Sequence, residues 1–187
     1  MLVLSAHGCG QYCGRTVADI AKSLGMEPLP AVFRILRETG LKSTAAFFGI
    51  RDQDICTILH HPLGMIGSDS DDCRAGDTAH PRTNGTFSRV LKHYAMDRNV
   101  ISLETAIRKM TGFPAERFGL YDRGLIREGY AADLVLLNPD TFADHADYLS
   151  PFASPSGIVM VLVNGQPALD GGEPTGAAAG RLLRHRP

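Results

Sequence analysis

The sequence predicts an α/β fold in two parts, a βα part over residues 1–122 and a β part over residues 123–187. Three observations support this prediction. Short apolar runs alternate with helically spaced apolar residues as far as Tyr121. Beyond that point, apolar and β-branched runs are separated by glycine turns and an Asn-Gly turn. The first part has only about three strands, too few to close an eight-stranded barrel, so we expect an incomplete fold.

Apolar periodicity and turn residues locate each element of the first part. Strands are predicted over residues 2–4, 43–48 and 63–67. Helices are predicted where apolar residues recur at helical spacing, and they cover residues 16–24, 28–39, 52–59, 86–96, 102–110 and 114–118. The second helix starts at Pro28 or Pro30, and Asp52 or Asp54 caps the third.

The second part is predicted to consist of strands and turns. The strands cover residues 124–129, 131–137, 158–163 and 167–169. Asn164-Gly165 is the strongest short hairpin signal, and it joins the last two strands. Pro167 predicts that the return strand lies at a sheet edge, because proline cannot donate a ladder hydrogen bond.

Composition and charge exclude several classes of partner. The formal net charge is −1, and no basic face is predicted, so no nucleic acid or anionic membrane partner is expected. No apolar stretch is long enough to cross a bilayer, and no signal peptide is recognisable. We therefore expect a cytoplasmic protein with reduced thiols at its four cysteines, Cys9, Cys13, Cys56 and Cys73. The Cys9/Cys13 spacing is only a weak metal signal, because no matching ligand pair accompanies it.

The stretch from Leu63 to Arg89 is the part most suited to carry chemistry. An apolar run ends in Asp69, and an Arg follows at position 82, just before a helix. Loops at the carboxyl ends of strands carry the active sites of α/β folds. An Asp in such a loop can transfer a proton or bind a metal, and the planar fork of an Arg can hold a substrate carboxylate.

Simpler roles are open for these residues. Asp69 could cap a loop or helix, and Arg82 could form a surface ion pair as readily as an anion clamp. His80 is expected to be a loop histidine that donates to backbone rather than a ligand, and Arg89 is expected to pair with a carboxylate. A calcium loop over Asp69, Asp71, Asp72 and Asp77 is excluded, because Arg74 occupies the glycine position and no Glu closes the loop.

Three blocks of sequence carry a resemblance to a known family. They cover residues 14–21, then 67–69 with 80–82 and 85–91, and finally 123–126 with 129–135 and 161–165. Together they resemble the C-terminal region of the N-acyl-D-amino-acid deacylases (D-aminoacylases) of the amidohydrolase superfamily. The His-Pro-Arg block with Gly-Thr-Phe and Arg-Val-Leu is specific to that branch, whereas the third block is shared by many amidohydrolases.

The resemblance implies the last βα units of a metal-dependent (β/α)8 barrel over residues 1–122 and part of a β-sandwich over residues 123–187. It implies zinc-dependent hydrolysis of the amide of an N-acyl-D-amino acid to a carboxylate and a D-amino acid. Asp69 would take a proton from the attacking water and pass it to the leaving amine, and would also ligate a second, weaker metal. Arg82 would pair with the α-carboxylate of the substrate.

The chain also departs from the family pattern. It contains no His-x-His, so the main zinc ligands are absent from these residues. We therefore expect the C-terminal portion of a larger enzyme, inactive by itself. One alternative is a non-catalytic fragment or subunit that needs a complementary N-terminal half, or that associates with its own copies. Another is a different amidohydrolase, such as a relative of dihydroorotase or hydantoinase.

Overall fold

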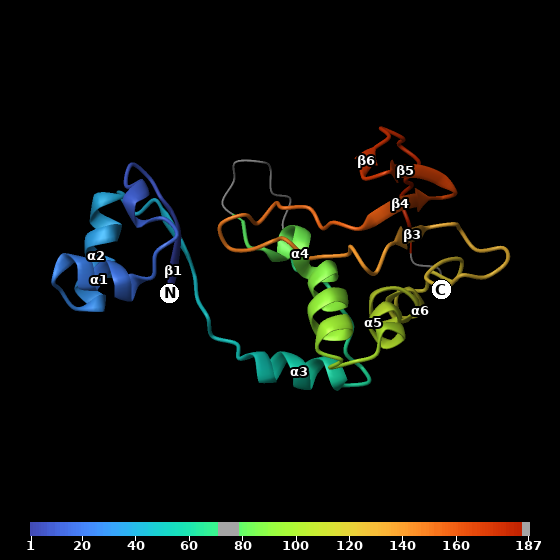
Figure 1. Cartoon of the computed structure of the whole chain (residues 1–187), viewed down its shortest axis with the longest axis horizontal. Helices are drawn as coiled ribbons and strands as arrows, with labels where there is room; N and C mark the ends of the chain where they lie inside the picture. Colours follow the sequence, from blue (N-terminus) through green and yellow to red (C-terminus); the bar gives the residue numbers. More distant parts are fainter. Residues whose placement is uncertain (71–78, 185–187) are drawn as a thin grey trace.

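The computed structural model describes residues 1–70 and 79–184. Figure 1 shows three groups of elements along the chain. The first contains β1, α1, α2 and β2, the second is a central group of helices, and the third is the sheet of β3 to β6. An extended stretch over residues 47–51 leads from the first group to the second.

The first group is a two-stranded sheet covered by two helices. Strand β1 (Leu2–Ala6) pairs antiparallel with β2 (Ser43–Ala46), whereas consecutive βα units of a barrel would pair in parallel. Between them, α1 (Val17–Leu24) and α2 (Pro28–Glu38) pack against each other, and this two-helix connection returns the chain in the opposite direction. No barrel is closed by the described residues, in agreement with the expectation of an incomplete fold.

Local signals explain the two helices of this group. The Thr16 side chain accepts a hydrogen bond from the N–H of Asp19 and so caps α1. Gly25 ends α1 in the left-handed conformation, which glycine adopts without steric cost. Pro28 begins α2, as predicted. The buried apolar faces of both helices meet those of β1 and the short 3₁₀ helix η1 (Gly10–Tyr12) in one core.

The second group contains α3 (Asp52–His60), α4 (Arg82–Arg89), the π-helix η2 (Val90–Asp97), α5 (Leu103–Met110) and α6 (Gly112–Arg117). The helix predicted over 86–96 thus begins four residues earlier and continues as a π-helix. Ser102 caps α5 through the N–H of Thr105, as predicted. Apolar residues from α3, η2 and α5 form a second core, which contains Cys56, Leu59, Val90, Tyr94, Ala95, Ile101 and Ala106.

The strand predicted over residues 63–67 does not form. This stretch is extended, but none of the described strands pairs with it. An apolar run becomes a strand only where a second strand accepts its backbone hydrogen bonds, and here α5 is the neighbour instead. The N–H of Ile66 donates to the carbonyl of Lys109 at 3.0 Å.

The third group is one antiparallel sheet in the order β3-β4-β5-β6. Its strands are β3 (Leu134–Leu137), β4 (Ile158–Val163), β5 (Gln166–Asp170) and β6 (Glu173–Pro174). Residues 124–129, predicted as a strand, form turns, in which Gly124 and Gly129 both have positive φ. Strand β5 is not at the edge, because β6 pairs beside it, and a register shift accommodates Pro167 opposite Leu162.

The described part of the chain forms a single layer here rather than a sandwich of two sheets. Val135 and Leu136 of β3 are more than half exposed, so they have no second sheet to pack against. Within residues 1–70 and 79–184, no helix is both long enough and apolar enough to span a membrane.

Candidate active site

Asp69 and Arg82 form an ion pair. The Arg82 Nη2 lies 3.2 Å from Asp69 Oδ2, so the structure brings together the two residues that the sequence singled out. The Asp69 side chain is 87% exposed and the Arg82 side chain is 42% exposed. Asp69 has a positive φ of 50°, a conformation that Asp tolerates better than most residues. The carboxylate therefore faces a guanidinium at the surface of the described part of the chain.

Lys109 fixes the segment that leads to Asp69. Its side chain is buried, and Nζ donates to the carbonyls of His61 at 2.6 Å and Gly64 at 2.8 Å. Burial, and to a lesser extent the charge of Arg108, lowers the pKa of Lys109. The ammonium thus bonds to two carbonyls at the start of this segment, where the Gly64 carbonyl has no strand partner and the His61 carbonyl also accepts the N–H of Gly64. Sequence reasoning placed the Lys109 helix but missed this contact.

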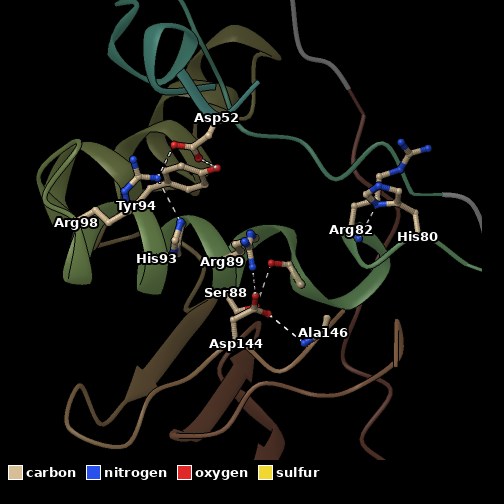
Figure 2. A network of polar contacts seen from close by, with 11 residues as sticks. Asp52, His80, Arg82, Ser88, Arg89, His93, Tyr94, Arg98, Asp144 and Ala146 are labelled. Atoms are coloured by element: carbon tan, nitrogen blue, oxygen red, sulfur yellow. Dashed lines mark hydrogen bonds and ion pairs between the residues drawn. The ribbon is translucent and has the colours of Figure 1, made fainter. Parts of the chain in front are cut away.

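His80 organises the start of α4. The N–H of Arg82 donates to His80 Nδ1 at 3.1 Å, and His80 Nε2 lies 3.3 Å from the Tyr148 hydroxyl. Burial and then the charge of Arg82 lower the pKa of His80. The loop histidine does bond to backbone, as expected, but as an acceptor rather than a donor. Figure 2 shows the contact between His80 and Arg82 at the start of α4.

Asp144 anchors the C-terminal end of α4. Its Oδ1 accepts from the Ser88 hydroxyl at 2.9 Å, and its Oδ2 lies 3.5 Å from Arg89 Nη1 (Figure 2). The Asp144 side chain is only 8% exposed. The prediction that Arg89 pairs with a carboxylate is confirmed. A Cβ on Gly85 would lie 2.8 Å from the Ala146 Cβ, so the glycine allows this close packing.

A third polar network joins η2 to α3. The Tyr94 hydroxyl donates to Asp52 Oδ1 at 2.9 Å, and Arg98 Nη1 lies 2.8 Å from Asp52 Oδ2. Hydrogen bonds from Arg98 and Tyr94 lower the pKa of Asp52. Burial, followed by the hydrogen bond to Asp52, raises the pKa of Tyr94. This network lies at the far end of the helices from Arg82 (Figure 2), where it joins η2 to α3.

The third sequence block is brought together by the buried Arg123. Its guanidinium pairs with Asp122 and Asp133 and lies 3.4 Å from the Asn164 side-chain oxygen. Asp133 also accepts from the N–H of Asn164 at 2.7 Å. This third block is thus a structural clamp that joins the approach to β3 with the β4–β5 hairpin.

The described residues do not fit a zinc site. Among them, no group of three or more His, Cys, Asp or Glu side chains converges as metal ligands would. A metal bound by Asp69 would therefore need ligands from elsewhere. Cys9, Cys13 and Cys56 are free thiols. Asp71, Asp72 and Asp77 of the excluded calcium loop, and Cys73, lie outside the described residues.

Two cavities of about 300 Å³ lie away from the ion pair. One is lined by residues 119, 120, 122, 123 and 181–184, and the other by residues that include Arg108, Tyr121 and Tyr130. Neither is lined by Asp69 or Arg82. Within the described residues, these two cavities are thus separate from Asp69 and Arg82.

Comparison with known proteins decides the family. Residues 13–168 match the amidohydrolase family. The chain belongs to the amidohydrolase family. It is 45% identical to a D-aminoacylase of Alcaligenes xylosoxydans xylosoxydans over 173 residues, which are 92% of this chain and 34% of the relative. It is 38% identical to an N-acyl-D-aspartate deacylase of the same organism, over 94% of this chain and 34% of the relative.

Solved structures agree with this relationship. The crystal structure of a D-aminoacylase matches with a TM-score of 0.77 and 36% identity, over 98% of this chain and 37% of that one. The structure of an N-acyl-D-glutamate deacylase from Bordetella bronchiseptica, complexed with zinc and a phosphonate inhibitor, matches with a TM-score of 0.72 and 33% identity. The match covers 92% of this chain and 36% of that one. The predicted relation to D-aminoacylases is confirmed, and this amidohydrolase spans about a third of the length of these relatives.

Proposed function

We propose that this chain takes part in the hydrolysis of the amide bond of N-acyl-D-amino acids, giving a carboxylate and a D-amino acid. The observation that carries the proposal is the 3.2 Å contact between Asp69 and Arg82. In an N-acyl-amino acid, the amide nitrogen and the α-carboxylate are attached to the same carbon atom. A proton-transfer group for one and a cation for the other must therefore be neighbours, as these residues are.

Asp69 is the proposed acid/base. Its carboxylate would accept a proton from the attacking water and donate it to the leaving nitrogen as the carbon–nitrogen bond breaks. The high exposure of the side chain in this chain leaves it accessible to a substrate. The described residues do not assemble zinc ligands, so Asp69 and Arg82 are the groups that this part of the chain itself would supply to the reaction.

Arg82 is the proposed binding group for the α-carboxylate. The contact with Asp69 is made through Nη2, and the side chain is partly exposed. A guanidinium has five N–H donors in a rigid fork, so it can hold a substrate carboxylate in addition to Asp69. This role predicts a preference for substrates with a free α-carboxylate.

The isolated chain is proposed to be inactive and to need a complementary N-terminal half. The support is the partial coverage of the relatives and the lack of a convergent ligand set among the described residues. The test is co-expression with the first two-thirds or so of a D-aminoacylase, followed by measurement of D-amino acid release from N-acetyl-D-amino acids. Release by the pair but not by either part supports the proposal, and no release by the pair contradicts it.

The role of Arg82 is tested in the same complemented enzyme. Arg82→Gln is expected to lower kcat/KM for the N-acetyl-D-amino acid but to leave the α-carboxamide analogue almost unaffected, since the analogue has no carboxylate to lose. Arg37→Gln, an exposed arginine on α2, is the matched control. An equal loss of kcat/KM for both substrates would contradict the proposal that Arg82 binds the α-carboxylate. Hydrolysis of cyclic ureides in preference to linear amides would favour a dihydroorotase-like or hydantoinase-like enzyme instead.

A further inference from the structure

Arg82 is linked to a residue far along the chain through His80. The hydroxyl of Tyr148 contacts one nitrogen of the His80 ring, and the other nitrogen accepts the backbone N–H of Arg82. We propose that Tyr148 is a positioning residue which, through His80, fixes the place from which Arg82 reaches the substrate carboxylate. This inference rests on the proposed function of Arg82.

The contacts of His80 define which of its two ring nitrogens carries the proton. A ring nitrogen that accepts a hydrogen bond carries no proton, so Nδ1 is the bare nitrogen and neutral His80 has its proton on Nε2. That proton points to the Tyr148 oxygen, which accepts it at 3.3 Å. The tyrosine therefore favours the one tautomer that leaves Nδ1 free to bind the N–H of Arg82.

The start of α4 lacks the usual capping side chain. The first N–H groups of a helix have no partner within the helix, and they are normally satisfied by a Ser, Thr, Asp or Asn side chain before it. Pro81 stands at this position, and its side chain makes no capping hydrogen bond. His80 supplies the missing acceptor to Arg82 itself. Loss of that bond would loosen the very residue whose side chain is proposed to bind substrate.

Tyr148 is held in place by ring contacts and by the hydrogen bonds of its own loop. The rings of His80 and Phe48 both stack edge-on against the Tyr148 ring, with centroids 5.1 and 5.2 Å away. Next to it, Asp147 accepts from the N–H groups of residues 149 and 150, which closes a turn. The same segment is attached to α4 by Asp144 and by a 2.8 Å hydrogen bond from Asn84 to the carbonyl of residue 152.

Tyr148 thus has a fixed position relative to the helix that begins with Arg82. Three stretches of chain meet at its ring: the residues after β2, the start of α4, and the loop between β3 and β4. A binding group must be held within a fraction of an ångström of its productive position, and supporting hydrogen bonds provide this precision. Through the contact of Tyr148 with His80, the loop between β3 and β4 therefore helps to position Arg82 for substrate binding.

The tautomer is measured on the 187-residue chain itself by ¹⁵N NMR of histidine-labelled protein, with His80 assigned by its loss in His80→Asn. The expected pattern is an unprotonated Nδ1 and a protonated Nε2. Tyr148→Phe, which keeps the ring but removes the hydroxyl, is expected to shift both His80 nitrogens and, in uniformly ¹⁵N-labelled protein, the Arg82 amide. Tyr121→Phe, at an exposed tyrosine, is the control. An Nδ1-protonated ring, or shifts that Tyr148→Phe leaves unchanged, would overturn the proposal.

The kinetic test uses the complemented enzyme. Tyr148→Phe is expected to raise KM for the N-acetyl-D-amino acid about 2- to 10-fold, the range of one neutral hydrogen bond, with little change in kcat or in turnover of the α-carboxamide. His80→Ala should do the same, and His80→Asn should recover much of the loss, because Asn can also accept the Arg82 N–H.

The outcomes separate the two proposals. If Arg82→Gln discriminates between the two substrates but Tyr148→Phe does not, the positioning role is wrong and the proposed function stands. If Arg82→Gln does not discriminate between the two substrates, the proposal that Arg82 binds the α-carboxylate is wrong, and the positioning role of Tyr148 is overturned with it. A loss in Tyr148→Phe that is equal for both substrates also contradicts the positioning role, since it indicates a general structural effect.

Discussion

Replacement of Lys109 by Met tests the segment that carries Asp69. The side chain is only 4% exposed, and its ammonium donates to the carbonyls of His61 and Gly64. Met fills most of the same volume but has no donor. The His61 carbonyl keeps one partner, the N–H of Gly64, so the larger loss is at the Gly64 carbonyl.

The magnitude follows from these contacts. Hydrogen bonds from a charged donor contribute about 1.5–3 kcal/mol each, and an abandoned buried carbonyl costs about 1–3 kcal/mol. The ammonium itself is costly to bury, which Met avoids, so part of the loss is recovered. The carbonyls cannot be removed with the lysine, however, so the penalty outweighs the gain. We expect Lys109→Met to lower the free energy of unfolding by about 2–4 kcal/mol.

The assay is urea unfolding followed by circular dichroism. Lys22→Met, at an exposed lysine on α1, is the matched control and is expected to change stability by less than about 0.5 kcal/mol. If Lys109→Met were as stable as the wild type, the two carbonyls would not depend on the ammonium. The reasoning about the segment before Asp69 would then be refuted.

Three further perturbations test other parts of the structure. Arg123→Met leaves the Asp133 carboxylate without its main partner and should cost about 3 kcal/mol in urea unfolding, whereas an unchanged midpoint would exclude the clamp. Gly85→Ala forces its new Cβ against Ala146 and should cost about 1–2 kcal/mol, despite the better helix propensity of Ala; a gain in stability would contradict this packing. Asp52→Asn tests how stability depends on pH, because the pKa of Asp52 is lowered in the folded protein. The ionised carboxylate therefore stabilises the wild type fully above the unfolded pKa of about 3.9, and this stabilisation is lost as pH falls through the folded pKa. The free energy of unfolding of the variant should therefore fall less steeply with decreasing pH than that of the wild type. Identical slopes would contradict the stabilising role of the Asp52 carboxylate.

Helices were the elements best predicted from the sequence, because their signals are local. Thr16 and Gly25 lie next to α1, and Ser102 lies next to α5, so capping could be inferred without knowledge of the rest of the fold. The start of α4 was missed because Pro81 and His80 replace the usual capping residues.

Predictions that depend on distant partners failed or could not be made. Residues 63–67 have the composition of a strand, but no described strand pairs with them, and Lys109 takes that place. Asp69 and Arg82 were found because both lie in a recognisable block. Asp144 and Tyr148, which hold α4 from the loop between β3 and β4, carry no signal in the sequence that points to α4.

The most direct test of the central claim is the activity of Asp69→Asn in the complemented enzyme. Asn keeps the size of the side chain and tolerates the positive φ of this position, but it cannot accept a proton from water. We predict that kcat for N-acetyl-D-amino acids falls about 100- to 10,000-fold, whereas the control Asp170→Asn, at the exposed end of β5, retains full activity. Wild-type turnover by Asp69→Asn would show that this carboxylate does not transfer the proton.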